Sequence, residues 1–128
     1  MNKPISRDIH ILIDYSYAAI VPLLPELAGF SKLRMAKTAC RLLGAGALGY
    51  TLLTKAPYTA LRVLPFRAHL VIDAAVSLLA LATPWLLGFS RNSAARNTLV
   101  TVGLAGLSVN LLTDLAKKAD SAQETLFI

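Results

Sequence analysis

The sequence predicts an all-α fold, a bundle of four transmembrane helices that is built from two tandem helical hairpins. Three observations lead to this prediction: an internal repeat, four long apolar stretches and a shortage of charged residues. Hydrophobic residues make up 55% of the chain and charged residues only 16%, whereas a soluble domain usually carries about 25% charged residues. Because so few polar side chains cannot cover four apolar helices in water, we expect the helices to lie in a lipid bilayer.

The internal repeat becomes visible when the chain is aligned with itself at an offset of 59 residues. His10 then aligns with His69, and Asp14 aligns with Asp73. The alignment needs no gap, and fourteen of the forty-five residues in the range 10–54 are identical to their counterparts. A repeat of this size is typical of one supersecondary unit that is used twice.

Each repeat is expected to form one antiparallel helical hairpin. Because a hairpin crosses the membrane twice, both copies insert in the same orientation and should be related by a pseudo-twofold axis along the membrane normal. We therefore predict a single membrane domain over residues 1–128. Repeat 1 covers about 1–59, repeat 2 covers about 60–118, and residues 119–128 form a short polar C-terminal tail.

Four apolar stretches of about membrane-spanning length are expected to form the helices. They lie at about 9–29, 36–54, 68–88 and 97–115. A spanning helix needs about 20 mostly apolar residues, and the third and fourth stretches meet this requirement best. The first stretch contains His10, Asp14, Pro22 and Pro25 and is the weakest of the four.

The first helix of each hairpin is expected to end or kink at a proline, because proline removes a backbone donor. This residue is Pro25 in the first repeat and Pro84 in the second. Gly88 follows at a plausible C-terminal cap. Trp85 and Phe89 are then expected at the level of the lipid headgroups, where amphipathic aromatic rings concentrate. We interpret this segment as an interfacial helix stop.

The second helix of each hairpin is rich in glycine and alanine. Ala45 and Gly49 have small-xxx-small spacing, and Gly103 and Gly106 are small residues of the second repeat. In lipid, helices associate where small residues let their backbones approach closely. We interpret these faces as packing surfaces, within the chain or between copies, and expect a homo-oligomer.

The basic residues lie beside the predicted helices and give the chain a net charge of +6. In such positions they bind anionic headgroups and set the orientation of the helices. Seven lysines and arginines fall on the side of the termini and six on the opposite side, so the bias is small; we assign the termini to the cytoplasmic side. Nucleic-acid binding would need a clustered basic face with aromatic residues for stacking, which the sequence lacks.

Motifs of catalysis are missing from the sequence. There is no glycine-rich phosphate loop, no Gly-x-Ser-x-Gly turn and no His-Glu-x-x-His helix. The single cysteine, Cys40, excludes an internal disulfide and a metal site built from cysteines. We therefore predict no enzymatic activity and no cofactor.

Two histidine–aspartate pairs are the polar residues that most need an explanation. His10 and Asp14 are four residues apart, as are His69 and Asp73, so each pair shares one face of its helix. Acidic side chains within a membrane helix are costly and often functional. The two pairs are therefore the candidate site of this protein.

The interpretation that we favour is a polar clasp. If the helices of a hairpin pair at matching depth, Asp14 lies level with Thr51, and Asp73 lies level with Asn110. Each aspartate would then form a hydrogen bond to the neighbouring helix. This predicts a structural or interaction role. The alternative is a small proton- or ion-coupled channel or transporter that uses the same residues. A histidine and an aspartate one helical turn apart are only a loose metal signature, so we predict no metal site.

The second repeat resembles the SPW-repeat membrane proteins, a family named for a Ser-Pro-Trp motif in the first of two membrane helices per repeat. The resemblance lies in the run Thr83-Pro84-Trp85-Leu86-Leu87-Gly88-Phe89-Ser90 and in the preceding segment 64–73. Thr83 stands where the motif has serine, and the first repeat keeps Pro25 but has Glu26 in place of tryptophan. The resemblance implies a multi-pass protein of the bacterial cytoplasmic membrane and implies no particular activity.

Overall fold

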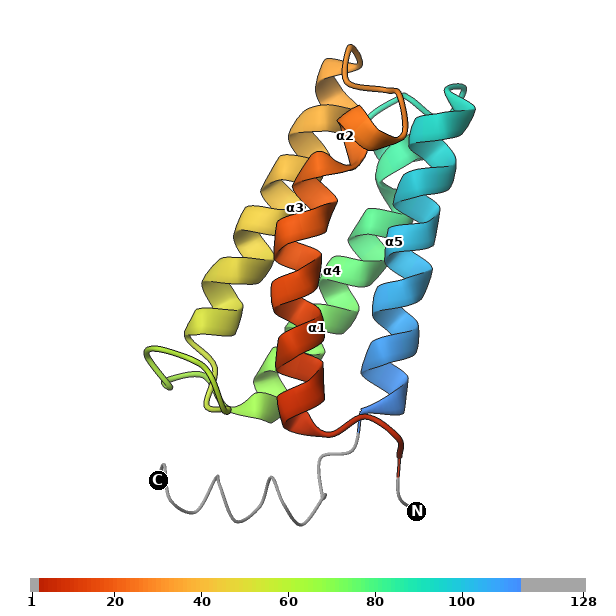
Figure 1. Ribbon diagram of the computed structural model, residues 1–128. Coiled ribbons are helices and arrows are strands. Elements are labelled where there is room, and N and C mark those ends of the chain that lie inside the picture. The colour runs from red at the N-terminus through yellow and green to blue at the C-terminus, as the bar shows by residue number, and fades with distance from the viewer. Residues whose placement is uncertain (1–2, 114–128) are drawn as a thin grey trace.

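The computed structural model describes residues 3–113, which fold into a bundle of four long helices with short connections (Figure 1). The elements are α1 (Arg7–Ile20), η1 (Val21–Leu23), α2 (Leu24–Leu27), α3 (Arg34–Leu52), α4 (Phe66–Leu86) and α5 (Ser93–Leu112). Only two isolated β-bridges and no strand occur within these residues, so the prediction of an all-α fold is confirmed. The predicted polar tail, 119–128, lies outside the described residues.

The four apolar stretches correspond to α1 with its short extensions, α3, α4 and α5. Among the described residues, one helix is long and apolar enough to cross a membrane by length and composition: α4, with 21 residues and a mean hydropathy of 1.6 over an 18-residue stretch. Large apolar side chains nevertheless point outward from all four long helices. Examples are Ile9, Leu12, Leu42, Leu48, Val71, Leu78, Leu104 and Leu111.

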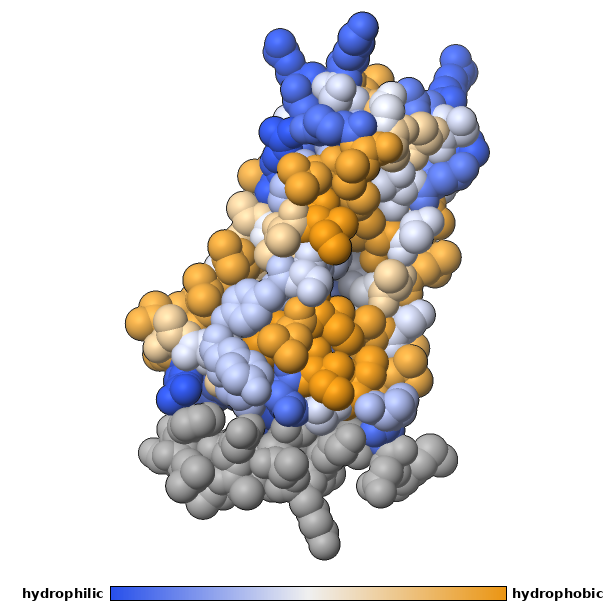
Figure 2. Space-filling view, in the orientation of Figure 1, coloured by the Kyte–Doolittle hydropathy of each residue, from blue (hydrophilic) through white to orange (hydrophobic). Residues whose placement is uncertain are grey.

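The surface separates into polar ends and an apolar middle. On the face seen in Figure 2, hydrophilic residues gather at the two ends of the bundle, and hydrophobic residues cover much of the middle. One end carries the turns that precede α3 and α5, with Lys32 and Arg91. The opposite end carries the start of α1 and the connection between α3 and α4, with Arg7 and Lys55.

The first predicted helix is interrupted, whereas its counterpart is continuous. α1 ends at Ile20, and the chain continues through the 3-10 turn η1, which contains Pro22, and then through α2, which contains Pro25. Proline has no backbone N–H and its ring clashes with the preceding turn, so it breaks the regular helix. Leu81 occupies the position equivalent to Pro22, and α4 therefore continues to Leu86.

Both hairpin turns close in the same way. Gly29 and Gly88 have φ angles of +82° and +78°, a left-handed conformation that glycine adopts without strain. The backbone N–H of Phe30 donates to the Pro25 carbonyl, and that of Phe89 donates to the Pro84 carbonyl, each at 2.8 Å. These bonds satisfy carbonyls at the end of the first helix, as in a Schellman motif.

The turn corrects one part of the predicted interfacial motif. Trp85 is 59% exposed, whereas Phe89 is only 6% exposed. Phe89 belongs to the same hydrophobic core cluster as Phe30. The reason is the positive φ of Gly88, which folds the chain back and turns the next side chain toward the interior.

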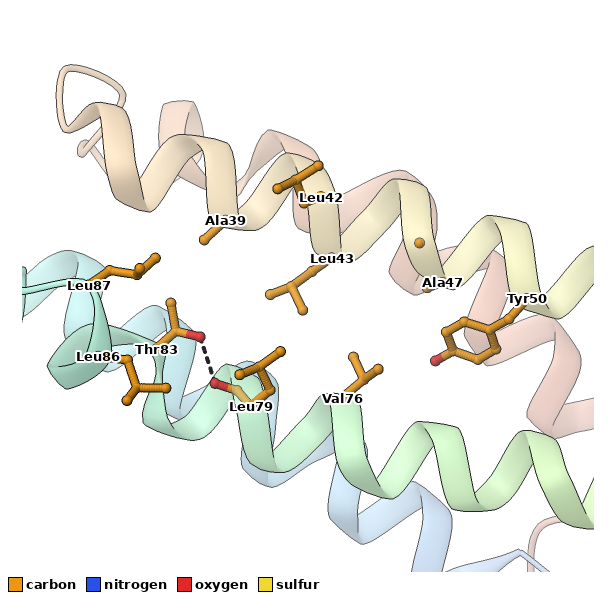
Figure 3. Close-up of a pocket in the computed structure, with 11 residues that line it drawn as sticks. Ala39, Leu42, Leu43, Ala47, Tyr50, Val76, Leu79, Thr83, Leu86 and Leu87 are labelled. Atoms are coloured by element: carbon orange, nitrogen blue, oxygen red, sulfur yellow. Dashed lines mark hydrogen bonds between the residues drawn. The ribbon is translucent and has the colours of Figure 1, made fainter.

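A groove separates α3 from α4 along the side of the bundle (Figure 3). It has a volume of about 390 Å³ and is lined mostly by apolar side chains, among them Leu42 and Leu43 of α3 and Leu79 and Leu86 of α4. Gly46 also lines it, and an added Cβ on this glycine would meet nothing within 4 Å. Because of this groove, α3 and α4 contact each other over only part of their length.

The segments that precede α1 and α4 are held in place by backbone contacts. Ile5 forms a bridge with Thr113, and Leu64 forms a bridge with Thr54. These two bridges are equivalent at the offset of the internal repeat, because Ile5 aligns with Leu64 and Thr54 aligns with Thr113. Each bridge brings the segment before a first helix next to the end of a second helix. This fixes the surroundings of the histidines.

Candidate functional site

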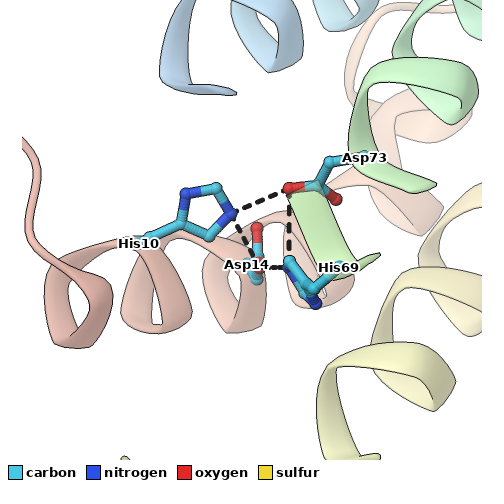
Figure 4. A group of neighbouring side chains, drawn as sticks. All are labelled: His10, Asp14, His69 and Asp73. Carbon is cyan, nitrogen blue, oxygen red and sulfur yellow. Dashed lines mark hydrogen bonds and ion pairs between the residues drawn. The ribbon is translucent and has the colours of Figure 1, made fainter. Parts of the chain in front are cut away.

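The two histidine–aspartate pairs come together at one place between α1 and α4 (Figure 4). His10 Nε2 lies 2.8 Å from Asp73 Oδ2, and His69 Nε2 lies 2.7 Å from Asp14 Oδ2. Within each helix the contacts are longer, 3.3 Å for His10–Asp14 and 3.5 Å for His69–Asp73. The four side chains therefore form a closed ring, which we call the His–Asp ring, and its shortest contacts link the two hairpins.

The His–Asp ring is buried. Both histidine side chains are 0% exposed, and both aspartate side chains are 12% exposed. Phe66 covers the histidines on one side: its ring stacks on His69 with an interplanar angle of 4° and meets the edge of His10. The guanidinium of Arg7 lies 4.8 Å from the centre of the same phenyl ring. Bulk water is thus kept away from the imidazoles.

Two threonines fix the orientation of the imidazole rings. His10 Nδ1 lies 2.7 Å from Thr113 Oγ1, and His69 Nδ1 lies 2.7 Å from Thr54 Oγ1. Each threonine hydroxyl donates its own hydrogen to a backbone carbonyl one turn earlier, at 2.6 Å. A hydroxyl has a single hydrogen, so each threonine accepts from the histidine, and Nδ1 carries a proton.

The proton on Nδ1 determines how the other ring nitrogen, Nε2, can bind the aspartate. With Nδ1–H pointing to threonine, the Nε2 atom of each histidine faces an aspartate oxygen. A contact of 2.7–2.8 Å between these atoms needs one shared proton. Two shared protons, two imidazoles and two carboxyl groups make the His–Asp ring neutral as a whole. Neutrality removes most of the cost of burying these groups.

The two aspartates have different neighbours. Tyr50 on α3 donates its hydroxyl hydrogen to Asp73 Oδ1. The residue equivalent to Tyr50 in the second repeat is Val109, which has no hydroxyl. Asp14 therefore lacks the corresponding tyrosine, and the His–Asp ring is asymmetric at this point.

The partners that matching helix depth predicted for the aspartates are not the observed ones. The Thr51 hydroxyl is buried and has no hydrogen-bond partner among the described residues. Asn110 donates to the backbone carbonyl of Leu70 at 2.6 Å instead of to Asp73. The prediction paired helices within one hairpin, whereas the short contacts of Asp14 and Asp73 reach histidines of the other hairpin.

The internal repeat contains a signal that points to the two threonines. Thr54 and Thr113 are identical residues at equivalent positions of the internal repeat. They are also the last aligned pair of the repeat, four residues beyond Tyr50 and Val109. Tyr50 has no such signal, because its counterpart is a valine.

A small cavity adjoins the His–Asp ring toward the middle of the bundle. Its volume is about 80 Å³, and its lining includes Asp14, Asp73, Tyr17, Tyr50 and Ser77. These side chains are contributed by α1, α3 and α4, so the cavity lies between the helices. A space of this size with several polar groups is suited to holding water.

Comparison with known proteins gives no further assignment. No protein-family model matches the chain, and no match is found among curated proteins or among solved structures. The function must therefore be argued from the site and from the surface.

Proposed function

We propose that this chain is a small integral membrane protein whose four long helices span the bilayer and whose role is structural or interactive. The His–Asp ring would join the two hairpins inside the membrane. Both hairpins would enter with the same orientation and be related by a pseudo-twofold axis along the membrane normal. The resemblance of segment 83–90 to SPW-repeat proteins agrees with this proposal and with a place in a bacterial cytoplasmic membrane.

The observation that carries the proposal is the distribution of large and small side chains. Large apolar residues are exposed on all four long helices, for example Leu42 on α3 and Leu111 on α5. The interior contains many small or polar residues, such as Ala36, Ala80 and Ser77. A water-soluble bundle places its large apolar side chains inside, whereas lipid tails favour the opposite arrangement.

The distribution of charge supports the same proposal. The charged residues described here, Asp14 and Asp73 included, lie in connections or within about two turns of a helix end. Glu26 and Arg41 near one end form an ion pair with each other. The carboxyl groups of Asp14 and Asp73 belong to the neutral His–Asp ring. Polar groups within a membrane need such internal partners, because lipid offers none.

Membrane insertion is tested by extraction and labelling. We expect alkaline carbonate to leave the full chain in the membrane pellet. In a Cys40→Ala background, Lys32→Cys and Arg91→Cys should react with a membrane-impermeant thiol reagent from the same side, and Tyr58→Cys from the opposite side. Release by carbonate, or equal labelling at all three positions in sealed cells, would contradict four spanning helices.

Self-association is part of the proposal. Gly46 and Gly49 on α3 face open space, so a helix of a second copy can approach them closely. Gly44 and Gly103, in contrast, already pack against helices of the same chain. Native mass spectrometry of protein released from mild detergent should detect an oligomer, and Gly46→Leu should shift it toward the monomer.

A second candidate function is proton- or ion-coupled transport. The cavity next to Asp14 and Asp73 favours it, because a transported ion needs a polar resting place within the bundle. Flux across proteoliposomes that stops in Asp14→Asn and Asp73→Asn variants of unchanged stability would establish transport. Wild-type vesicles without flux would leave the structural role as the remaining proposal.

A further inference from the structure

We propose that the His–Asp ring is a binding site for one divalent transition-metal ion of the zinc class. The ligands would be Nε2 of His10, Nε2 of His69, and one carboxylate oxygen each of Asp14 and Asp73. The spacing of each pair along the sequence is a weak metal signal, but the structure unites two such pairs. The inference does not depend on membrane insertion.

The positions of the four donor atoms fit a single ion. All four lie within 4.8 Å of one another, and successive atoms around the ring are 2.7, 3.3, 2.8 and 3.5 Å apart. Zinc holds nitrogen and oxygen ligands at about 2.0–2.2 Å in tetrahedral geometry, so its ligands are about 3.3–3.6 Å apart. Two contacts already have about this length, the two shorter ones need to open by about half an ångström, and the widest separation across the ring, up to 4.8 Å, needs to close by about 1.2 Å.

The threonines supply the supporting contacts that a metal site requires. A histidine that binds metal usually donates its other ring N–H to a nearby acceptor, which fixes the ring and the tautomer. Thr113 and Thr54 accept these hydrogens from His10 and His69 at 2.7 Å. The lone pair of each Nε2 is thereby directed at the centre of the His–Asp ring.

The charge and the chemistry of the donors select the ion. Two carboxylates balance a divalent cation, and the protons shared within the ring leave as the ion enters. Imidazole nitrogen favours zinc and its neighbours over magnesium and calcium, which prefer oxygen ligands. The cavity of about 80 Å³ beside Asp14 and Asp73 provides room for an approaching ion and for a water ligand.

The test uses the untagged full chain in mild detergent, stripped with a chelator and titrated with Zn²⁺ against a chromogenic competitor. We expect one Zn²⁺ per chain and no comparable binding of Mg²⁺. His10→Ala and His69→Ala should each weaken binding at least tenfold, and Thr54→Val should weaken it by about 10–100-fold. Glu26→Gln and Cys40→Ser are matched controls that remove a potential ligand elsewhere, and they should bind like the wild type.

X-ray absorption at the zinc edge of the loaded wild type keeps the proposal testable if the histidine variants do not fold. These are the only two histidines of the chain, so a count of two imidazole ligands identifies His10 and His69. Absence of binding by the folded wild type, fewer than two imidazoles, or full binding by both histidine variants would overturn the proposal. Carbonate extraction is unaffected by these outcomes, so the membrane proposal stands or falls separately.

Discussion

The two hairpins, α1 with α3 and α4 with α5, make the same contacts at the His–Asp ring. They differ in how their helices pack. At the His–Asp ring, His10 and His69 make equivalent contacts to a threonine and an aspartate of the opposite repeat. In the middle, Gly103 of α5 lies against the backbone of α4, whereas its counterpart Gly44 lies against the ring of Pro22. The polar contacts of the two hairpins thus depend on identical residues, whereas their helices pack through different residues.

Gly106 and Ser77 are an example of this different packing in the second hairpin. A Cβ on Gly106 would lie well within 3.0 Å of the Ser77 hydroxyl. The equivalent residues of the first hairpin are Ala47 and Ala18. A larger residue on one helix is thus matched by a smaller one on the other, and the sum of the two side chains changes little. Volume-conserving exchanges of this kind are the ones that packed interiors tolerate best.

The largest effect is expected at Gly103. A Cβ there would lie 2.7 Å from the Ser77 carbonyl oxygen and 2.9 Å from the Leu81 nitrogen. Because these are backbone atoms, the helices must separate, and Gly103→Ala should lower the free energy of unfolding by about 3 kcal/mol. Unfolding in mild detergent, followed by circular dichroism, measures this change.

Gly46→Ala is the matched control for Gly103→Ala. A Cβ at Gly46 meets no atom of its own chain within 4 Å, so in the monomer the substitution should be neutral or stabilise the helix by up to about 1 kcal/mol through helix propensity. If both variants unfold like the wild type, the second hairpin is not closely packed, and the comparison fails.

An intermediate effect is expected at Gly106, and it should be reversible. Gly106→Ala alone should destabilise the protein by about 2 kcal/mol, because the new methyl group meets the Ser77 hydroxyl. In a Ser77→Ala background, the pair becomes the Ala–Ala pair of the first hairpin, and most of this loss should disappear. A double-mutant cycle on thermal unfolding should give a coupling above about 0.5 kcal/mol; strictly additive effects would contradict the proposed exchange.

The difference between the hairpins also explains what the sequence could predict. The positions of the helices followed from apolar stretches, and the importance of His10, Asp14, His69 and Asp73 followed from their spacing and the repeat. Their partners did not follow, because matching depths along one hairpin says nothing about how two hairpins are placed against each other. Contacts between distant segments, such as His10 with Thr113, depend on that placement.

Residues without a counterpart in the repeat were the hardest to predict. Tyr50 aligns with Val109, so the repeat gave no reason to assign it to the site. Phe89 does have a counterpart, Phe30, and its shared burial is a consequence of the left-handed glycine that precedes each. Sequence patterns report what is periodic or repeated, whereas single contacts require coordinates.

The smallest effect is expected at Tyr50, where the His–Asp ring is asymmetric. Tyr50→Phe removes the hydrogen bond to Asp73 and leaves Asp14 untouched, so the free energy of unfolding should fall by about 1 kcal/mol, the size typical of interhelical hydrogen bonds in membrane proteins. Tyr17→Phe is the control, because the Tyr17 hydroxyl has no hydrogen bond among the described residues. It should unfold like the wild type.

Tyr50→Phe also tests whether the two halves of the His–Asp ring respond independently. His10 has its short contact with Asp73, and His69 has its short contact with Asp14. Loss of the tyrosine hydrogen leaves Asp73 a stronger acceptor, so the nitrogen NMR signals of His10 should move more than those of His69. Equal movement of both signals would mean that the two shared protons respond as one system. In that case the hydrogen bond of Tyr50 acts on the whole His–Asp ring and not on its His10–Asp73 half alone.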